Sequence, residues 1–397
     1  MTITIYPSLA KGEIKAPPSK SYAHRFLIAS ALANKESKIS NIDLSNDIKA
    51  TINCLSSLGY EFKYEDNVIT IKPNKNISNK FDANESGSTL RFLIPLLLNK
   101  TKEFTIKGTK KLFSRGLEEY IYLFDKQGIQ YELKEDSLWA KGEFKPGIFN
   151  IDASKSSQYV TGLLFLLPIL NGDSELHLGS SISSRPYIDL TLYTLEKYGV
   201  HVEEKDNIFY IKGNQYYVSQ DIEVEGDYSN AAFLDAFNLL GGEVTVKNLN
   251  PSSLQGDKFY KECFMLLKEN SPTIDLKDTI DLGPILFTLA SIYNGATFLN
   301  INRLRIKESD RVKDMLTLLD KFNVKYLEED NRLTIYKSEL KAPKEILRPA
   351  NDHRIVMSMA VLLSKYGGSM DNIEAVNKSY PNFFDDIRKL GIKYEIK

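Results

Sequence analysis

Six clusters of small polar and charged residues each stand directly before, or at the start of, an apolar run. They are residues 19–21 with Arg25, 86–88 with Arg91, 156–158, 227–230, Asp281, and 352–354. Apolar runs of this kind are typical of buried helices, and a helix N-terminus presents unpaired N–H groups and a partial positive charge. Such ends bind phosphate or carboxylate groups, and nearby Lys and Arg side chains strengthen the binding. The pattern therefore indicates an enzyme site for a substrate with several negative charges.

The densest charge cluster is residues 303–311, RLRIKESDR. The alternation of basic and apolar residues over 303–307 predicts a strand whose basic side chains share one side. Glu308 or Ser309 is then expected to begin an amphipathic helix that carries Arg311 on its first turn. Cations that converge beside a carboxylate would suit a substrate with two anionic ends and a proton to be transferred.

Two further segments place cations or a close backbone approach at a helix start. In PPSKSYAHR (17–25), one of the two serines is expected to cap a helix on which Lys20 and Arg25 share nearly one face. In ESGSTLR (85–91), Gly87 would let a ligand approach the backbone closely, although the ending of a full P-loop is absent.

The elements that position these clusters recur along the chain. Each unit contains a buried helix, an amphipathic helix, a hinge residue and a hairpin with an acidic turn. The hinge residues Gly59, Gly128, Gly199, Asn270, Asn323 and Gly391 are 69, 71, 71, 53 and 68 residues apart. Gly or Asn is expected there because a helix often ends in a left-handed residue. A degenerate copy of the hinge and hairpin is expected over residues 264–274. The repeats predict two α/β domains of three units each, with buried helices inside and sheets around them.

Composition bounds the class of protein. The chain has 397 residues, of which 42% are apolar and 26% charged, and a formal net charge of −1. These values are typical of a globular protein with two domains, and they give no indication of a nucleic-acid or membrane partner. The two cysteines, Cys54 and Cys263, lack metal-ligand spacing and are expected to be buried thiols in a reducing compartment. We expect a cytoplasmic protein.

Eight segments, in order along the chain, resemble those of the 5-enolpyruvylshikimate-3-phosphate synthase family of enolpyruvyl transferases. They are PPSKSYAHR (17–25), ESGSTLR (85–91), SSQ (156–158), SRPYID (184–189), GDYSNAAF (226–233), DLGPI (281–285), RLRIKESDR (303–311) and NDHR (351–354). The resemblance implies an inside-out α/β barrel pair of six βαβαββ units. It also implies a discontinuous first domain (1–18 and 227–397), a second domain (19–226), and an active site in the cleft between them.

The resemblance further implies transfer of the enolpyruvyl group of phosphoenolpyruvate to the 5-hydroxyl of shikimate 3-phosphate, through a tetrahedral intermediate and with release of phosphate. It implies a monomer with no metal or redox cofactor. The phosphoenolpyruvate ligands would be Lys20, Gly87, Arg115, Gln158, Arg311, Arg354 and Lys378. The shikimate 3-phosphate ligands would be Lys20, Ser21, Arg25, Ser156, Ser157, Gln158, Ser184, Asp281 and Lys307. Asp281 would accept the hydroxyl proton and Glu308 would donate to the methylene carbon, with Lys20 sharing in proton transfer.

Some positions depart from the better-known bacterial pattern of the family. Glu85 stands where Asn is common, Ser88 replaces a Thr, and Gly116 replaces a frequent Pro. Arg303 also stands where some members have Asn. Because Gly87 lies where the inhibitor glyphosate would meet the backbone, these changes leave glyphosate sensitivity open.

Three alternative functions were weighed against this one. The sister enzyme that uses UDP-N-acetylglucosamine carries a Cys in a mobile loop and a Lys-Asn pair near its start, whereas this chain has Ser19, Lys20 and Ser21 there. A non-catalytic anion-binding protein would lack an acid or base, yet Asp281 and Glu308 are both present. A kinase-like phosphotransferase would need a phosphate loop and a set of metal-binding carboxylates, and neither motif is found.

Overall fold

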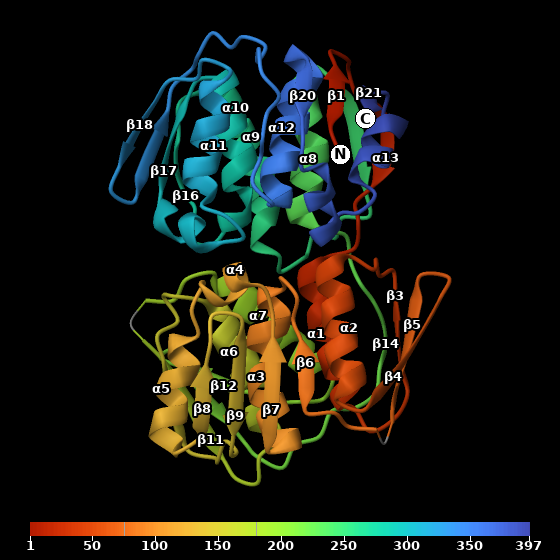
Figure 1. Ribbon diagram of the computed structural model, residues 1–397, viewed down its shortest axis with the longest axis vertical. Helices are drawn as coiled ribbons and strands as arrows, with labels where there is room; N and C mark the ends of the chain where they lie inside the picture. Colours follow the sequence, from red (N-terminus) through yellow and green to blue (C-terminus); the bar gives the residue numbers. More distant parts are fainter. Residues whose placement is uncertain (75, 180) are drawn as a thin grey trace. The chain divides into compact units, whose positions relative to one another are not determined.

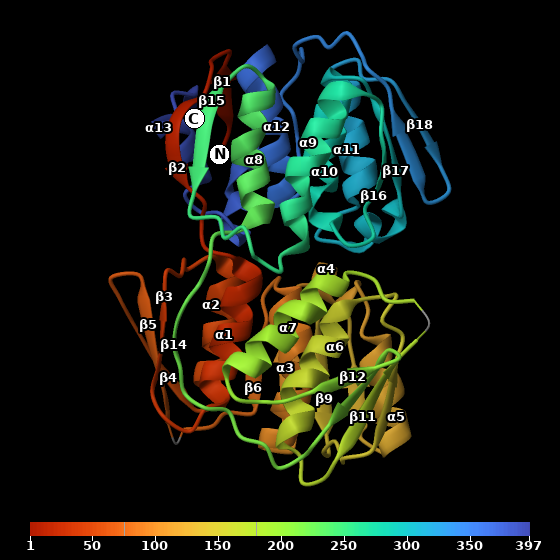
Figure 2. The same cartoon turned by 180° about the vertical axis from the view of Figure 1, so that it is seen from behind.

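In the computed structural model, which describes residues 1–74, 76–179 and 181–397, the chain divides into two compact units. One unit consists of Met1–Pro17 and Gly226–Lys397, and the other of Pro18–Glu225. Both junctions lie one residue before the boundaries that the family resemblance implied. Figures 1 and 2 show the two units from opposite sides.

The described part of the Pro18–Glu225 unit contains three four-stranded sheets with one common pattern. In each sheet the first two strands are parallel and the remaining neighbours are antiparallel. The first sheet has the spatial order β14 (Asp221–Glu223), β3 (Ser37–Ser40), β5 (Val68–Pro73) and β4 (Tyr60–Glu65). The second has the order β6 (Lys80–Asp82), β7 (Glu103–Lys107), β9 (Ser137–Lys141) and β8 (Gln130–Leu133). The third has the order β10 (Ile148–Ile151), β11 (Ser174–Leu178), β13 (Ile208–Ile211) and β12 (Glu203–Lys205). The first sheet takes its edge strand β14 from the end of the unit, so the first repeat is completed by the returning chain.

The most buried helices of this unit form its interior, and the sheets and the amphipathic helices lie around them (Figures 1 and 2). The nearly all-buried helices are α1 (Lys20–Leu32), α3 (Gly87–Thr101) and α6 (Ser157–Leu166), which continues into η1 (Leu167–Ile169). The helices with one exposed face are α2 (Asn46–Ser57), α5 (Glu118–Gln127) and α7 (Arg185–Lys197), and α4 (Lys110–Phe113) is a single turn. The predicted buried runs 24–33, 90–98 and 160–170 therefore all lie in interior helices, because an apolar surface on every side of a helix can be satisfied only there.

The other unit repeats the pattern with less complete sheets. Among its described residues, one sheet has the full order β16 (Thr273–Asp275), β17 (Ala296–Leu299), β19 (Arg332–Ile335) and β18 (Tyr326–Glu329). A second has the order β20 (Gly368–Met370), β1 (Ile3–Tyr6) and β21 (Lys393–Ile396), with a parallel bridge from Leu347 to Met370 where the first strand would lie. The third repeat is only the parallel pair β15 (Glu243–Lys247) and β2 (Lys11–Lys15).

The helices of this unit also alternate between buried and half-exposed. The buried helices are α8 (Tyr228–Leu239), α10 (Gly283–Ile292) and α12 (His353–Tyr366). The outer helices are α9 (Tyr260–Glu269), α11 (Arg311–Asp320) and α13 (Phe383–Lys389), and short 3₁₀ turns are η2 (Gly256–Phe259), η3 (Ile280–Leu282), η4 (Ile301–Ile306) and η5 (Ile373–Lys378). The predicted α/β class with three repeats in each of two domains is confirmed. Among the described residues, the sheets remain separate and do not join into a continuous barrel.

The hinge residues explain how each repeat turns from its outer helix into its hairpin. The backbone is left-handed at Gly59, Gly128, Gly199, Asn323 and Gly391, with φ of +98°, +68°, +77°, +65° and +96°. Asn270 is the exception, since its φ of −154° is extended. The prediction of a hairpin over 264–274 is therefore wrong: α9 leads directly into β16, the first strand of the next repeat. Pro272 restricts Ser271 to extended backbone, which favours the direct passage from α9 into β16.

Asp-Asn pairs form two of the hairpin turns. Asp66 and Asn67 join β4 to β5, and Asp206 and Asn207 join β12 to β13, all with positive φ. Two consecutive positive φ values match the tight turn whose twist suits a hairpin. Across the described ranges, none of the helices has the length and apolar character that crossing a membrane requires.

Candidate functional site

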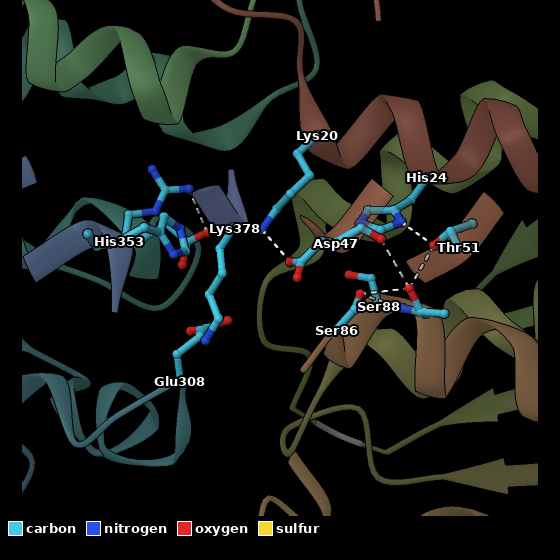
Figure 3. Close-up of polar contacts among 12 residues, drawn as sticks. Lys20, His24, Asp47, Thr51, Ser86, Ser88, Glu308, His353 and Lys378 are labelled. Atoms are coloured by element: carbon cyan, nitrogen blue, oxygen red, sulfur yellow. Dashed lines mark hydrogen bonds and ion pairs between the residues drawn. The ribbon is translucent and has the colours of Figure 1, made fainter. Parts of the chain in front are cut away.

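Lys20 is the first residue of α1 and is held by a carboxylate from the next helix. Its Nζ lies 2.8 Å from Oδ2 of Asp47, and the two side chains are only 18% and 11% exposed. Figure 3 shows the Lys20 ammonium directed at Asp47. Ser19 is the N-cap residue of α1, although its side chain makes no capping hydrogen bond. Asp47 was missed from the sequence, because an acidic residue in the first turn of an amphipathic helix is ordinary.

Arg25 is buried one turn after Ser21 on α1. Its Nε donates to Thr191 Oγ1 at 2.9 Å, and its Nη1 and Nη2 donate to the carbonyls of Ser21 and Tyr187, both at 2.7 Å. Burial lowers the pKa of Arg25 to about 10. Arg25 therefore ties α1 to α7, and its predicted role as a ligand of shikimate 3-phosphate stays a prediction.

Gly87, Arg115 and Gln158 are brought together around Arg91. A Cβ atom on Gly87 would lie 3.0 Å from Arg115 Nη1 and 3.2 Å from Arg91 Nη1. Arg91 donates to Gln158 Oε1 at 3.0 Å and to the carbonyls of Arg115 and Gly116 at 3.1 and 2.8 Å. The sequence motif contained Arg91, but it was not included among the expected ligands. Its buried guanidinium joins the starts of α3 and α6 and packs against the loop that carries Arg115.

The predicted serine ligands all lie at helix starts. Ser156 is the N-cap of α6 and accepts a hydrogen bond from the backbone N–H of Gln158 at 3.3 Å. Ser157 is the first residue of α6 and is buried. Ser184 is the N-cap of α7 and has a left-handed backbone, with φ of +57°, that is uncommon for a residue with a side chain. These positions present hydroxyl groups and backbone N–H groups at the same helix ends.

In the unit formed by Met1–Pro17 and Gly226–Lys397, Arg311 is surrounded by carboxylates. Its side chain is 1% exposed, and its Nε, Nη1 and Nη2 contact Asp352 Oδ2, Asp281 Oδ1 and Glu308 Oε2 at 2.7, 2.8 and 2.8 Å. Asp352 also caps α12 by accepting from the backbone N–H of Arg354 at 2.9 Å. Residues far apart in sequence therefore converge on one guanidinium, which fixes the predicted acid Glu308 and the predicted base Asp281.

Arg354 has hydrogen-bonding capacity that the described residues do not use. Its Nη2 donates to Asp281 Oδ2 at 3.2 Å, and its guanidinium lies 5.8 Å from the ring centroid of Phe233. Within the described ranges, its Nε and Nη1 are buried and have no hydrogen-bond partner. A buried charged N–H group without a partner is costly, so both atoms would gain from an acceptor supplied by a ligand or by water.

Burial and neighbouring charges shift the pKa values of Asp281 and Lys307. Burial alone would raise the pKa of Asp281, but the cations of Arg354 and Arg311 outweigh burial and hold it well below its ordinary value. Burial lowers the pKa of Lys307 to about 8, although the Asp281 carboxylate acts in the opposite direction. Lys378 is buried, and its Nζ donates to the Asn351 carbonyl at 3.2 Å. In Figure 3 its side chain extends toward Glu308.

The local structure of residues 303–311 differs from the prediction. Residues Ile301–Ile306 form the 3₁₀-helix η4, and α11 begins at Arg311 with Asp310 as its N-cap. Leu304 is fully buried whereas Ile306 is 53% exposed, so the two do not share one face as they would in a strand. Asp310 accepts from the backbone N–H of Lys313 at 3.0 Å, which explains why the helix begins there and not at Glu308 or Ser309.

The comparisons with known proteins agree along the whole chain. The family model for EPSP synthase (3-phosphoshikimate 1-carboxyvinyltransferase) matches residues 6–387. Proteins named 3-phosphoshikimate 1-carboxyvinyltransferase from Clostridium novyi (strain NT) and Clostridium beijerinckii are 39% and 40% identical to this chain. Each of these matches covers 98% of this chain and 97% of the relative. The solved structure of EPSP synthase from Acinetobacter baumannii has the same fold, with a TM-score of 0.80 at 18% identity over 100% of this chain and 99% of that one. The chain therefore belongs to the EPSP synthase family.

Proposed function

We propose that this chain transfers the carboxyvinyl group of phosphoenolpyruvate to the 5-hydroxyl of shikimate 3-phosphate and releases phosphate, a step of the shikimate pathway of aromatic amino-acid biosynthesis. Family membership over the full length supports this reaction. At the level of the site, one observation carries the proposal. Arg354 lies next to Asp281, which also pairs with Arg311, and its buried Nε and Nη1 have no hydrogen-bond partner among the described residues.

The two substrates need many positive groups, and the proposed ligands include several lysines and arginines. For phosphoenolpyruvate the proposed ligands are Lys20, Gly87, Arg115, Gln158, Arg311, Arg354 and Lys378. Arg311 already has three carboxylate partners, so it would mainly orient these partners and supply positive charge. Arg354 has unused donors and would make the direct contacts.

For shikimate 3-phosphate the proposed ligands are Lys20, Ser21, Arg25, Ser156, Ser157, Gln158, Ser184, Asp281 and Lys307. The serines at helix starts offer hydroxyl and backbone N–H donors, which suit a phosphate. Arg25 is held by protein carbonyls and a hydroxyl group, so its proposed contribution is positive charge and the placement of Ser21.

The proposed reaction is an addition followed by an elimination. Glu308 donates a proton to the methylene carbon of phosphoenolpyruvate while the 5-hydroxyl oxygen bonds to the adjacent carbon and loses its proton to Asp281. In the second step Glu308, now a carboxylate, takes a proton back from the new methyl group and the phosphate departs with its bonding electrons, which restores the double bond. Lys20 would share in these proton transfers. No oxidation state changes, and we propose that neither a metal nor a redox cofactor takes part.

The ion pairs of Asp281 bear on its proposed role as the base. A carboxylate held well below its ordinary pKa is a weak proton acceptor, because Arg354 and Arg311 stabilise its charged form. An anionic substrate group that takes hydrogen bonds from Arg354 would withdraw positive charge from Asp281 and raise its pKa. Binding of phosphoenolpyruvate would thereby activate the base only when the substrate is present.

We also propose that the protein is a cytoplasmic monomer. Both cysteines, Cys54 and Cys263, are buried thiols that form no disulfide, which suits a reducing compartment. Light scattering coupled to size exclusion would test the monomer, with the mass of one chain as the expected result.

The function is tested by phosphate release from the purified protein with phosphoenolpyruvate and either shikimate 3-phosphate or UDP-N-acetylglucosamine as acceptor. We expect release that depends on shikimate 3-phosphate. Release only with the nucleotide sugar would assign the chain to the sister reaction. No release with either acceptor, in a folded protein that binds both ligands, would make it a non-catalytic anion-binding protein.

A further inference from the structure

A buried polar network joins the first turns of three neighbouring helices in the Pro18–Glu225 unit (Figure 3). Each helix contributes two residues that are three or four positions apart, and therefore lie on one face. The six residues are Lys20 and His24 of α1, Asp47 and Thr51 of α2, and Ser86 and Thr89 at the start of α3. We call them the N-terminal network.

The inner part of the network is a chain of hydrogen bonds. His24 Nδ1 lies 2.8 Å from Thr51 Oγ1, which lies 2.7 Å from Thr89 Oγ1. Thr89 Oγ1 donates to Ser86 Oγ at 2.7 Å. All four residues are at most 1% exposed, so water cannot replace a lost partner. In such surroundings each hydrogen bond is strong and an unmade one is costly.

The donor and acceptor roles along this series of hydrogen bonds determine the tautomer of His24. Thr89 uses its hydroxyl hydrogen toward Ser86, so Thr51 donates to Thr89 and must accept from His24 Nδ1–H. His24 Nε2 is buried without a partner among the described residues, and an unpaired buried acceptor is tolerated better than an unpaired N–H. Both arguments place the single proton on Nδ1. Burial and the cations of Lys20 and Arg25 hold the pKa of His24 well below its ordinary value, so the ring stays neutral.

The chain of hydrogen bonds ends beside the groups that the proposed function places in the anion site. Ser86 immediately precedes Gly87, and its Oγ accepts from the backbone N–H of Thr89 at 3.1 Å. Thr51 lies one turn after Asp47 on α2, and the Asp47 side chain holds Lys20. The position of Thr89 is thus coupled to the Gly87 turn on one side and to the partner of Lys20 on the other.

We propose that His24 and Thr51 are positioning residues that hold Lys20 and the Gly87 turn in their anion-binding arrangement, an inference that rests on the proposed function. An apolar side chain in place of His24 would avoid the unpaired Nε2. The histidine is therefore explained by what its Nδ1–H holds, which is the hydroxyl chain from Thr51 to Ser86.

The decisive variant is Thr51→Val, which keeps the shape of the side chain and removes the hydroxyl group. We expect it to raise the KM for phosphoenolpyruvate and the Kd for inorganic phosphate about tenfold or more, because small displacements of binding groups are costly. Thr51→Ser restores the hydroxyl group and should return both constants to near the wild-type values. His24→Asn places an N–H near the position of Nδ1 and should retain most of the affinity, whereas His24→Leu should behave like Thr51→Val.

The matched control is Thr194→Val on α7. Thr194 is equally buried, but among the described residues its hydroxyl group donates only to the Leu190 carbonyl of its own helix, at 2.8 Å. We expect this control to lower the melting temperature somewhat without changing KM or the phosphate Kd. The double variant His24→Leu with Thr51→Val should raise KM and the phosphate Kd no further than the more affected single variant does, because both substitutions break the same series of hydrogen bonds.

Several outcomes would overturn the proposal. If Thr51→Val and His24→Leu lower the melting temperature but leave both constants within about twofold of wild type, the network serves packing alone. If neither variant folds, the network is required for folding itself, and the positioning role is wrong. If the wild-type protein does not use shikimate 3-phosphate, the proposed function fails, yet the phosphate Kd values still decide whether the network positions the anion site.

Discussion

Replacing Arg354 with glutamine should strongly weaken the use of phosphoenolpyruvate while changing the stability of the free protein little. The guanidinium makes one hydrogen bond, from Nη2 to Asp281 at 3.2 Å, and its buried Nε and Nη1 have no partner within the described residues. A charged hydrogen bond contributes about 1.5–3 kcal/mol, and a buried unsatisfied donor costs about 1–3 kcal/mol. In the free protein, removing the two unsatisfied donors offsets the loss of the hydrogen bond to Asp281 by a comparable or larger amount, so we expect no large loss of stability.

The ligand-bound protein should lose much more. If Nε and Nη1 each donate to an anionic group of phosphoenolpyruvate, their removal costs about 3–6 kcal/mol, or roughly 10²–10⁴-fold in kcat/KM. Asp281 is not left unpaired by the substitution, because Arg311 Nη1 remains 2.8 Å from its Oδ1. A large loss in kcat/KM with little change in stability would therefore identify Arg354 as a ligand group.

The assay is steady-state phosphate release at varied phosphoenolpyruvate, together with thermal unfolding of the free protein. Arg348→Gln is the matched control, because Arg348 is 82% exposed and lies 3.9 Å from Asp371. We expect the control to behave like wild type in both measurements. The reasoning is refuted if Arg354→Gln stays within tenfold of wild type in kcat/KM, or if it mainly destabilises the free protein.

Three further substitutions test the other proposed roles. Glu308→Gln should leave both substrates bound but collapse kcat, because the shape is kept and the donated proton is lost; near-normal kcat would remove Glu308 from the chemistry. Arg25→Ala should weaken shikimate 3-phosphate binding by about 1.5–3 kcal/mol. It should also lower the melting temperature, because Arg25 ties α1 to α7 through Thr191 and Tyr187; an unchanged binding constant in a titration would move it out of the site. Burial lowers the pKa of Lys307 to about 8 from its ordinary 10.5, so its ammonium is lost as pH rises through about 8. The KM for shikimate 3-phosphate should therefore rise above that pH, and a flat profile, or one that Lys307→Arg leaves unchanged, would contradict this role.

The sequence was sufficient for the features that depend on local physics. Apolar periodicity located the buried helices, and left-handed helix ends located five of the hinge residues, such as Gly59 and Asn323. The repeat predicted a left-handed hinge at Asn270, but its backbone is extended and α9 leads directly into β16. Likewise, the alternation over 303–307 suggested a strand, whereas residues 301–306 form a 3₁₀-helix that leaves Ile306 exposed, and capping by Asp310 begins α11.

Long-range polar pairs could not be predicted from spacing. Lys20 and Asp47 are 27 residues apart, and Arg311 and Asp352 are 41 residues apart, so no periodicity connects them. The same holds for Arg91, whose partners lie on a loop and on a different helix. These pairs determine the charge of the candidate site, which only the three-dimensional arrangement reveals.

The most direct test of the central claim is to run the reaction in D₂O with phosphoenolpyruvate and shikimate 3-phosphate and to analyse the product by mass spectrometry. The addition–elimination account predicts that shikimate 3-phosphate gains one carboxyvinyl group and that deuterium enters its methylene position, because the transient methyl group takes a solvent proton and then loses one. Release of phosphate without such a product, or a carboxyvinyl product free of deuterium throughout turnover, would contradict the account.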